Sequence, residues 1–260
     1  KVILSVEKLS VRNARGILGV RDLSIEVRSG EIVGIAGVDG NGQTELIYAI
    51  TGLAPAETGR ILLNGVDITK MTVKQRINAG VGHIPEDRHR HGLVLDFSVA
   101  DNSVIKNYDK VPFSSRFGIL DEKVITAHAE NLISQYDIRA GEGPRMKASN
   151  MSGGNQQKVI IAREIDLSPD LLVVAQPTRG LDVGAIEYIR KRIVEERDKG
   201  RAVLLVSFEL DEIMNLCDRI AIISKGEIAG IFNEGEADEH QIGFMMAGTK
   251  QVDAIKEDVR

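Results

Sequence analysis

Two hydrophobic periods alternate along the chain, and their order predicts an α/β protein. Short runs rich in β-branched residues predict strands at Val2–Val11, Leu23–Val27 and Ile32–Ala36, and the turn "RSGE" between the last two predicts a hairpin. The run "EIVGIAG" is apolar throughout, as expected of a buried parallel strand. A glycine loop follows it, then a helical pattern at Thr44–Thr51 that Gly52 closes. Strand, glycine loop and helix in this order are the context of a phosphate-binding loop.

The middle of the chain has a different pattern. From about Val99 to Met151, segments such as "DEKVITAHAENLISQYDI" show helical spacing and no strand pattern. Strand patterns resume with "PDLLVVA" and "RAVLLVSF", with a predicted helix between them at Val183–Asp198, and "RIAIISKGEIAGIFNEG" predicts a hairpin turning at Lys225 and Gly226. We therefore expect an α/β core interrupted by a helical insertion. The expected limits are 1–98 and 152–235 for the core, about 99–151 for the helical subdomain, and 236–260 for a C-terminal tail.

Composition excludes several classes of protein. A chain of 260 residues with 43% hydrophobic residues can bury a core as one large domain or two small ones. Its net charge of −5 has no basic excess, so nucleic acid is not expected as a partner. The single Cys217 excludes a disulfide framework and suits a reducing cytoplasm. The longest uncharged run, Leu46–Ala56, is too short to span a membrane, and no signal-peptide pattern opens the chain. Lys1 lies directly in a strand-like run, which suggests a segment of a longer polypeptide.

The loop "GVDGNGQTELI" fits a phosphate-binding loop in all but one position. Such a loop reads G-x-x-x-x-G-K-[ST], and here Gln43 stands where the lysine belongs. The lysine brings positive charge to the β- and γ-phosphates, and losing such a bond costs about 1.5–3 kcal/mol. The glycines still allow backbone amides to converge on an anion at a helix N-terminus, and Thr44 keeps a hydroxyl for weakly held magnesium. The expected nucleotide-binding residues are Gly37, Gly40, Asn41, Gly42, Gln43, Thr44 and Glu45.

Four further stretches combine with this loop. "NMSGGNQQKVIIAREI" places Ser152 as an N-cap candidate, followed by Gly153 and Gly154, immediately before a helix. "DLLVVAQPTRGLDVGA" ends a buried strand in a Pro-Thr turn and then reaches Asp182. "VLLVSFELDEI" ends another strand, and "VGHIPEDRHRHGLV" precedes the helical insertion. In this order and spacing, the stretches are specific for one family.

Across nearly its whole length the chain resembles the ATPase domain of ATP-binding-cassette (ABC) proteins. The resemblance implies a P-loop NTPase fold over 1–260, with an antiparallel β subdomain and an inserted helical subdomain, that binds ATP with Mg²⁺. "SGGNQQK", "EDRHRHGLV" and "PTRGLDVGA" resemble importers of sugars and nucleosides, in which one polypeptide carries two cassettes, and this chain is similar to the second. "AQPTRGLD", "GVDGNGQTE" and "SFELDE" resemble the branch that imports nucleosides such as guanosine and other purines.

That resemblance also implies partners and a location. The expected partners are the N-terminal cassette of the same polypeptide, the membrane permease subunits and, through the permease, a substrate-binding lipoprotein. The expected location is the cytoplasmic face of the plasma membrane, as a peripheral protein. Glu86 takes the position of a family glutamine, and Arg88 and Arg90 are expected near the groove that receives the permease's coupling helix.

The chain departs from the family at the hydrolytic site. Ala175 and Gln176 replace an Asp that orders the magnesium shell and a Glu that polarises the attacking water, and Phe208 replaces a switch histidine. No aromatic residue for stacking on adenine occurs around 13–19. An amide in place of a base-like carboxylate forfeits about 10²–10⁴-fold in rate. We therefore expect no catalytic residues, no hydrolysis at this chain's own site, and ATP and Mg²⁺ bound weakly or not at all there.

The signature "SGGNQQK", by contrast, is intact. In the family, two cassettes face each other head to tail, and each ATP lies between one cassette's phosphate loop and the other's signature. Ser152 offers a hydroxyl, Gly153 and Gly154 permit close backbone approach, Gln156 belongs to the same motif, and Asp182 lies in the turn that crosses the dimer seam. The resemblance thus implies that this cassette completes its partner's ATP site.

Two other functions remain open on the sequence. The first is a catalytically active cassette of a sugar importer of the ribose or galactose type, in which Gln43 and Gln176 suffice for turnover. The second is a cassette protein of DNA repair or translation, which predicts a basic surface or a long coiled-coil insertion that the sequence lacks. A metal site at the histidines of "GHIPEDRHRHG" (His83, His89 and His91) is conceivable, but the segment lacks cysteines and a fixed ligand geometry, which favours a solvated or partner-facing loop.

Overall fold

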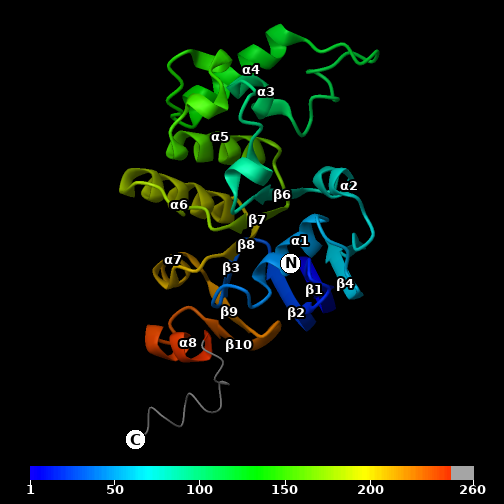
Figure 1. Cartoon of the computed structure of the whole chain (residues 1–260), viewed down its shortest axis with the longest axis vertical. Helices are drawn as coiled ribbons and strands as arrows, with labels where there is room; N and C mark the ends of the chain where they lie inside the picture. Colours follow the sequence, from blue (N-terminus) through cyan, green and yellow to red (C-terminus); the bar gives the residue numbers. More distant parts are fainter. Residues whose placement is uncertain (247–260) are drawn as a thin grey trace, which may run out of the picture. The chain divides into compact units, whose positions relative to one another are not determined.

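A computed structural model describes residues 1–246, so residues 247–260 of the predicted tail lie outside the described residues. The chain forms two compact units (Figure 1). The first contains Lys1–His83, Pro169–Gln176 and the described residues from Lys191 onward, and the second contains Ile84–Ser168 and Pro177–Arg190. Within the described residues, no helix combines the length and the apolar character needed to cross a membrane.

An antiparallel sheet begins the first unit. Its strands are β1 (Val2–Arg12), β2 (Leu18–Arg28), β4 (Thr58–Leu63) and β5 (Val66–Asp67), in the order β2-β1-β4-β5. In β2, buried Leu23, Ile25 and Val27 alternate with exposed residues, as in a sheet with one face on the core. The predicted antiparallel β part of the fold is therefore confirmed.

A six-stranded sheet forms the rest of the core of the first unit, in the order β10-β9-β3-β8-β7-β6. Its strands are β3 (Glu31–Ala36), β6 (Val81–Ile84), β7 (Leu171–Ala175), β8 (Ala202–Val206), β9 (Arg219–Ser224) and β10 (Glu227–Asn233). Strand β3 runs parallel to β8 and β9, and β7 runs parallel to β8. Every residue of β7 and β8 is buried, which explains their continuous apolar runs. The predicted hairpin at Lys225 and Gly226 is present between β9 and β10.

The hairpin predicted at "RSGE" is wrong. A turn is present at Ser29–Gly30, but β2 pairs with β1 in the antiparallel sheet whereas β3 pairs with β8 and β9 in the other. The turn therefore carries the chain from one sheet to the next. The physical reason is burial: β2 has one buried face, whereas β3 is buried on both faces and takes parallel neighbours.

Helix α1 (Gln43–Thr51) follows β3 and ends at Gly52, whose φ of 85° supplies the left-handed C-cap. Arg76 of α2 (Val73–Asn78) is buried and donates to the carbonyl oxygens of Ala49 and Ile50, in the last turn of α1. It also donates to the carbonyl oxygens of Thr69 and Met71. Burial lowers the pKa of the Arg76 guanidinium. The other helices are α6 (Val183–Asp198), which contributes residues to both units, α7 (Leu210–Leu216) and α8 (Glu239–Met246).

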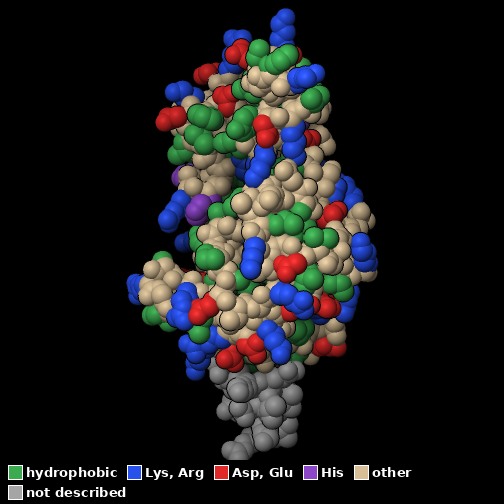
Figure 2. All heavy atoms as spheres, turned by 90° about the vertical axis from the view of Figure 1, so that its right-hand side faces the viewer, with side chains coloured by type: hydrophobic (Ala, Val, Ile, Leu, Met, Phe, Trp, Pro, Cys, Tyr) green, Lys and Arg blue, Asp and Glu red, His purple; other side chains and the backbone are tan. Residues whose placement is uncertain are grey.

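The second unit is helical. It contains a π-helix, η1 (Arg88–Gly92), then α3 (Val99–Val104), α4 (Glu122–Gln135), the 3-10 turns η2 (Gly143–Arg145) and η3 (Ala148–Asn150), and α5 (Gly153–Asp166). A small core of Ala100, Val104, Phe113, Ile125 and Ala129 joins α3 to α4. Between these helices, Val111, Phe117 and Ile119 are exposed; Figure 2 shows hydrophobic side chains close to Lys and Arg side chains at the end of the molecule where Figure 1 draws α3 and α4.

Candidate functional site

The carboxyl ends of three parallel strands meet at one edge of the six-stranded sheet. Ile35 of β3 pairs with Val206 of β8, and Val206 pairs with Ala175 of β7. The residues after these strands therefore leave the sheet at the same edge. They are the glycine loop from Gly37, the segment containing Phe208, and Gln176. Three regions that the sequence singled out separately thus belong to one edge of the first unit.

The backbone of the glycine loop keeps the shape of an anion site. Gly40 and Gly42 have φ of 84° and 107°, and Gly42 is the N-cap of α1 without any side-chain cap. The first N–H groups of α1 therefore have no side-chain partner and can bind an anion. A side chain at Gly42 would collide with the carbonyl oxygen of Gly19, and one at Gly37 would come within 2.6 Å of the Ile223 oxygen. The loop path therefore requires these glycines.

Gln43 is turned into its own loop. Its side chain is buried, and Nε2 donates a hydrogen bond of 3.1 Å to the carbonyl oxygen of Val38. A Cβ at Gly37 would lie 2.6 Å from that nitrogen, so the carboxamide packs against the start of the loop. The group is neutral and supplies none of the charge of a lysine. The loop therefore fits a phosphate through its backbone and not through the side chain at this position.

Asn41, Thr44 and Glu45 complete the loop. The side-chain oxygen of Asn41 accepts a 3.0 Å hydrogen bond from Lys225 N, and its main-chain oxygen accepts one of 3.0 Å from Gly226 N. These bonds fix the loop to the turn between β9 and β10, a contact that no pattern in the sequence indicated. Glu45 packs against Gly19, and Thr44 is partly exposed at the helix start.

The end of β7 beside the loop carries no acid or base. Ala175 has no polar side-chain atom and is buried. Gln176 has a φ of 46°, and its Oε1 accepts a 3.3 Å hydrogen bond from Phe208 N. Its Nε2 is buried and has no hydrogen-bond partner among the described residues. A carboxamide with its NH₂ group inward cannot take up a proton. Within residues 1–246, no group of three or more His, Cys, Asp or Glu is placed to hold a metal ion.

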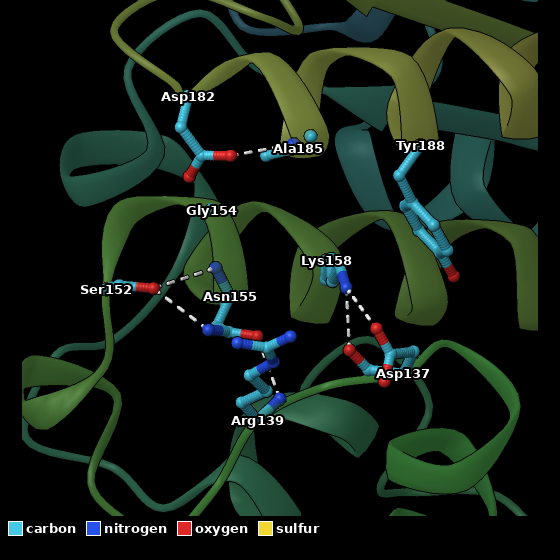
Figure 3. A pocket seen from close by; sticks show the side chains of 10 residues that line it. Asp137, Arg139, Ser152, Gly154, Asn155, Lys158, Asp182, Ala185 and Tyr188 are labelled. Atoms are coloured by element: carbon cyan, nitrogen blue, oxygen red, sulfur yellow. Dashed lines mark hydrogen bonds and ion pairs between the residues drawn. The ribbon is translucent and has the colours of Figure 1, made fainter.

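A cavity lies at the start of α5 in the helical unit. Its volume is about 330 Å³, and Figure 3 shows Ser152, Gly154 and Asp182 around it. Ser152 is the N-cap of α5, as predicted, and its Oγ accepts a hydrogen bond from Asn155 N. Asp182 accepts a 2.9 Å bond from Ala185 N at the start of α6. A Cβ at Gly154 would lie 3.2 Å from that of Ala185, so the glycine permits close packing of α5 on α6.

Further polar residues of this cavity were not identified from the sequence. Lys158 Nζ donates to Oδ2 of Asp137 over 2.9 Å and to its main-chain oxygen over 2.7 Å, and it lies 4.4 Å from the ring centroid of Tyr188. The hydrogen bond and charge of Lys158 lower the pKa of Asp137. Arg139 and Asn155 also line the cavity. Asn155 stands in the motif itself, whereas nothing in the sequence linked Asp137 and Arg139 to it.

Gly153 and Gln156 do not line this cavity. Gln156 is buried, its Nε2 donates to Ala148 O over 2.9 Å, and its Oε1 lies 2.9 Å from Nε2 of His89. A Cβ at Gly153 would lie 3.0 Å from a guanidinium nitrogen of Arg88. Both residues therefore contact the π-helix η1.

The "EDRHRHG" segment makes contacts within the second unit. Glu86 forms a 2.5 Å ion pair with Arg179, and Arg88 donates to the Arg179 carbonyl oxygen over 3.3 Å. Asp87 caps η1 by accepting from His89 N and Arg90 N, and these hydrogen bonds, that from Arg90 N first, lower its pKa. Arg90 is exposed. Arg88 thus connects the Pro-Thr turn to the start of α5, and Glu86 holds Arg179 of the same turn.

The six-stranded, mostly parallel sheet with its glycine loop, the antiparallel sheet and the helical unit define a P-loop ATP-binding cassette. Solved structures support this class: a nucleotide-free ATP-binding cassette of an ABC transporter covers 98% of this chain with a TM-score of 0.78 at 23% identity, over 99% of that structure. The ADP form of the cassette MJ1267 covers 98% of this chain and 99% of that structure, with a TM-score of 0.75 at 22% identity. At such identities the likeness concerns the fold alone.

Sequence comparisons give the family. The family model described as "ABC transporter" matches residues 20–179, and the chain belongs to this family, whose members bind ATP, usually with Mg²⁺. The nucleoside import ATP-binding protein NupA of Lactococcus lactis subsp. cremoris is 53% identical over 95% of this chain and 48% of that protein. The guanosine import ATP-binding protein NupO of Bacillus subtilis is 52% identical over 98% of this chain and 49% of that protein. The glucose import ATP-binding protein TsgD13 of Haloferax volcanii is 43% identical over 95% of this chain and 45% of that protein. The chain therefore spans about half the length of these relatives.

Proposed function

We propose that this chain is the second, non-hydrolysing cassette of a two-cassette nucleoside importer, and that its signature completes the ATP site of the first cassette. One contrast carries the proposal. Gln43 and Gln176 are neutral amides at the chain's own site, whereas Ser152, Gly154 and Asp182 line an open cavity. The nucleoside and guanosine import relatives, of which the chain spans about half, support the importer and the two-cassette arrangement.

At the chain's own site, the glycine loop can bind phosphate but supplies no group that takes part in hydrolysis. The open N-terminus of α1 and the glycine backbone attract phosphate, and Thr44 offers a single oxygen to Mg²⁺. Ala175 has no side-chain oxygen to order the ion, and Gln176 cannot take a proton from water. ATP and Mg²⁺ are therefore bound weakly or not at all here. Hydrolysis belongs to the full transporter.

At the signature, the chain's residues act on a nucleotide held by the partner cassette. ATP, when bound there, supplies a negatively charged γ-phosphate. Ser152 donates its hydroxyl to this group, and Gly153 and Gly154 let the first turn of α5 approach it. Asp182, fixed by its bond from Ala185 N, holds the turn that faces the partner.

The domain limits, the partners and the location are also part of the proposal that the chain belongs to an importer. The division into core (1–98 and 152–235), helical subdomain (about 99–151) and tail (236–260) stays part of the proposal. So do the partners: an N-terminal cassette in the same polypeptide, permease subunits, and a substrate-binding lipoprotein that acts through the permease on the other side of the membrane. The chain then works at the cytoplasmic face of the plasma membrane. Arg90, which is exposed, is better placed for the permease than Glu86 and Arg88, whose side chains already contact Arg179.

The deciding experiment uses the full polypeptide with its permease. Ser152→Arg places bulk at the start of α5 and should abolish ATPase activity and transport. Gln43→Ala should keep both within a few-fold, because the site it lines does not turn over. If Gln43→Ala stops transport and Ser152→Arg is tolerated, the roles of the two sites are reversed.

The alternative is an active ATPase cassette of a sugar importer. The 43% identity to a glucose import ATP-binding protein supports this alternative. It predicts magnesium-dependent ATP turnover by the isolated chain that Thr44→Ala removes. It also predicts sugar rather than nucleoside uptake by the full transporter.

A further inference from the structure

The carboxamide of Asn155 bridges two segments of the helical unit (Figure 3). Its Oδ1 accepts a 2.8 Å hydrogen bond from Arg139 N, and its Nδ2 lies 2.9 Å from Oγ of Ser152. A main-chain N–H can only donate, so the Asn155 atom that faces Arg139 must be the oxygen. The orientation of the amide, which is often ambiguous, is thereby fixed, and its NH₂ group faces Ser152.

This orientation determines what the Ser152 hydroxyl can do. An NH₂ group can only donate, so Ser152 Oγ accepts from Asn155 Nδ2, and it accepts a second, longer bond of 3.5 Å from Asn155 N. A hydroxyl has two acceptor lone pairs and one proton to donate. With both lone pairs engaged, the proton is directed away from Asn155. Ser152 lines the cavity at the start of α5, where a ligand can accept a hydrogen bond from that hydroxyl.

An ordinary helix cap does not account for this bridge. In a capping box, the side chain three residues after the N-cap accepts from the main-chain N–H of the N-cap residue. Asn155 occupies that position, but its oxygen accepts from Arg139 instead. The bridge therefore ties the signature to the segment before it rather than closing the first turn of α5.

The two carboxylates and two cations that line the cavity balance in formal charge, and the N-terminus of α5 adds a local preference for an anion as the acceptor. The carboxylate of Asp182 is engaged by Ala185 N, and that of Asp137 is engaged by Lys158. Arg139 lines the same cavity, and α5 directs its N-terminus there.

We infer that Asn155 is a positioning residue that orients the Ser152 hydroxyl as a hydrogen-bond donor towards a phosphate held by the partner cassette. This inference rests on the proposed function for the identity of the phosphate. The bridge between Arg139, Asn155 and Ser152 stands independently of it, so the two can be tested separately.

The first test uses the 260-residue chain and measures amide hydrogen exchange at Arg139 by NMR. Asn155→Ala removes the acceptor and should speed exchange at Arg139 by about tenfold. Asn155→Asp keeps an oxygen in place and should leave exchange unchanged. Asn131→Ala, at an exposed position of α4, serves as the control. Equal exchange in the Asn155→Ala variant and the parent would overturn the inference.

The second test is a double-mutant cycle on ATPase activity in the full polypeptide with its permease. If Asn155 acts through Ser152, Asn155→Ala should lower kcat/KM for ATP by about 3–10-fold in the parent and leave it unchanged in a Ser152→Ala background. Additive effects would refute a positioning role. Activity that survives both Ser152→Ala and Ser152→Arg would instead refute the proposed function, even with faster exchange at Arg139.

Discussion

The main-chain amide of Phe208 donates a hydrogen bond to Oε1 of Gln176 over 3.3 Å, and the NH₂ group of Gln176 is left buried without a partner. One bond from the segment after β8 therefore fixes the orientation of the side chain after β7. The position where the family resemblance leads us to expect a catalytic carboxylate is occupied here by a buried amide.

Gln176→Glu tests whether this position tolerates a carboxylate. One oxygen of the new carboxylate can accept from Phe208 N, but the other is buried without a donor, so its pKa should rise in the folded state. The folded protein then binds more protons than the unfolded one, and stability falls as pH rises above about 4.3. We expect a melting temperature that drops between pH 5 and pH 8 relative to the parent, with ATPase activity still at background. Equal pH dependence in the two proteins would show that the site is hydrated.

Gln43→Lys tests the loop at the other strand end. A lysine restores a charge-assisted bond worth about 1.5–3 kcal/mol, so ATP affinity should rise by about 10–150-fold in a calorimetric titration of the isolated chain. Hydrolysis should stay at background because Ala175, Gln176 and Phe208 are unchanged. Thr44→Ala in the same background should reduce the magnesium-dependent part of the binding. Unchanged affinity would mean that a lysine side chain at position 43 does not reach the bound phosphates.

Arg76→Met tests how much the hydrogen bonds of Arg76 to the last turn of α1, the helix that follows the glycine loop, contribute to stability. The change keeps an apolar stem but leaves the carbonyl oxygens of Ala49 and Ile50 buried without their donor. We expect a loss of roughly 2–5 kcal/mol in the free energy of unfolding, measured in urea. Arg60→Met is the matched control: Arg60 forms an exposed ion pair with Glu7, and its loss should cost less than about 1 kcal/mol. Equal costs for the two variants would show that Arg76 contributes no more than a surface charge.

The sequence predicted those parts of the molecule that depend on local patterns. The helix limits at Val183–Asp198, the helix end at Gly52 and the N-cap at Ser152 all follow from short-range spacing, and the structure confirms them. The hairpin at "RSGE" failed because the partner of a strand is chosen by burial on its two faces, which a turn alone does not reveal. For the same reason, the sheet order could not be obtained from the turns.

In the cavity at the start of α5, too, the residues in local motifs were predicted and those brought in by the fold were not. Ser152, Gly154 and Asp182 were identified because they lie in motifs, whereas Asp137 and Arg139 lie upstream in a segment that carries no motif. They reach the cavity through the packing of the chain after α4 onto α5. The contacts of Glu86 and Arg88 with Arg179 were missed because they join segments 93 and 91 residues apart. Long-range pairs of this kind need the fold before they can be seen.

The pair between Asp137 and Lys158 gives the last prediction. Lys158 lowers the pKa of Asp137 in the folded chain, first through its hydrogen bond and then through its charge. A carboxyl group with a lowered folded pKa contributes stability that is present above its unfolded pKa of about 3.9 and is lost as pH falls through the folded value. NMR titration of the Asp137 carboxyl carbon should therefore give a midpoint below that of an unfolded chain. Lys158→Met should return the midpoint towards about 3.9, whereas Lys191→Met, on the neighbouring helix α6, should leave it unchanged. A midpoint that does not move in the Lys158→Met variant would show that the ion pair is absent in solution.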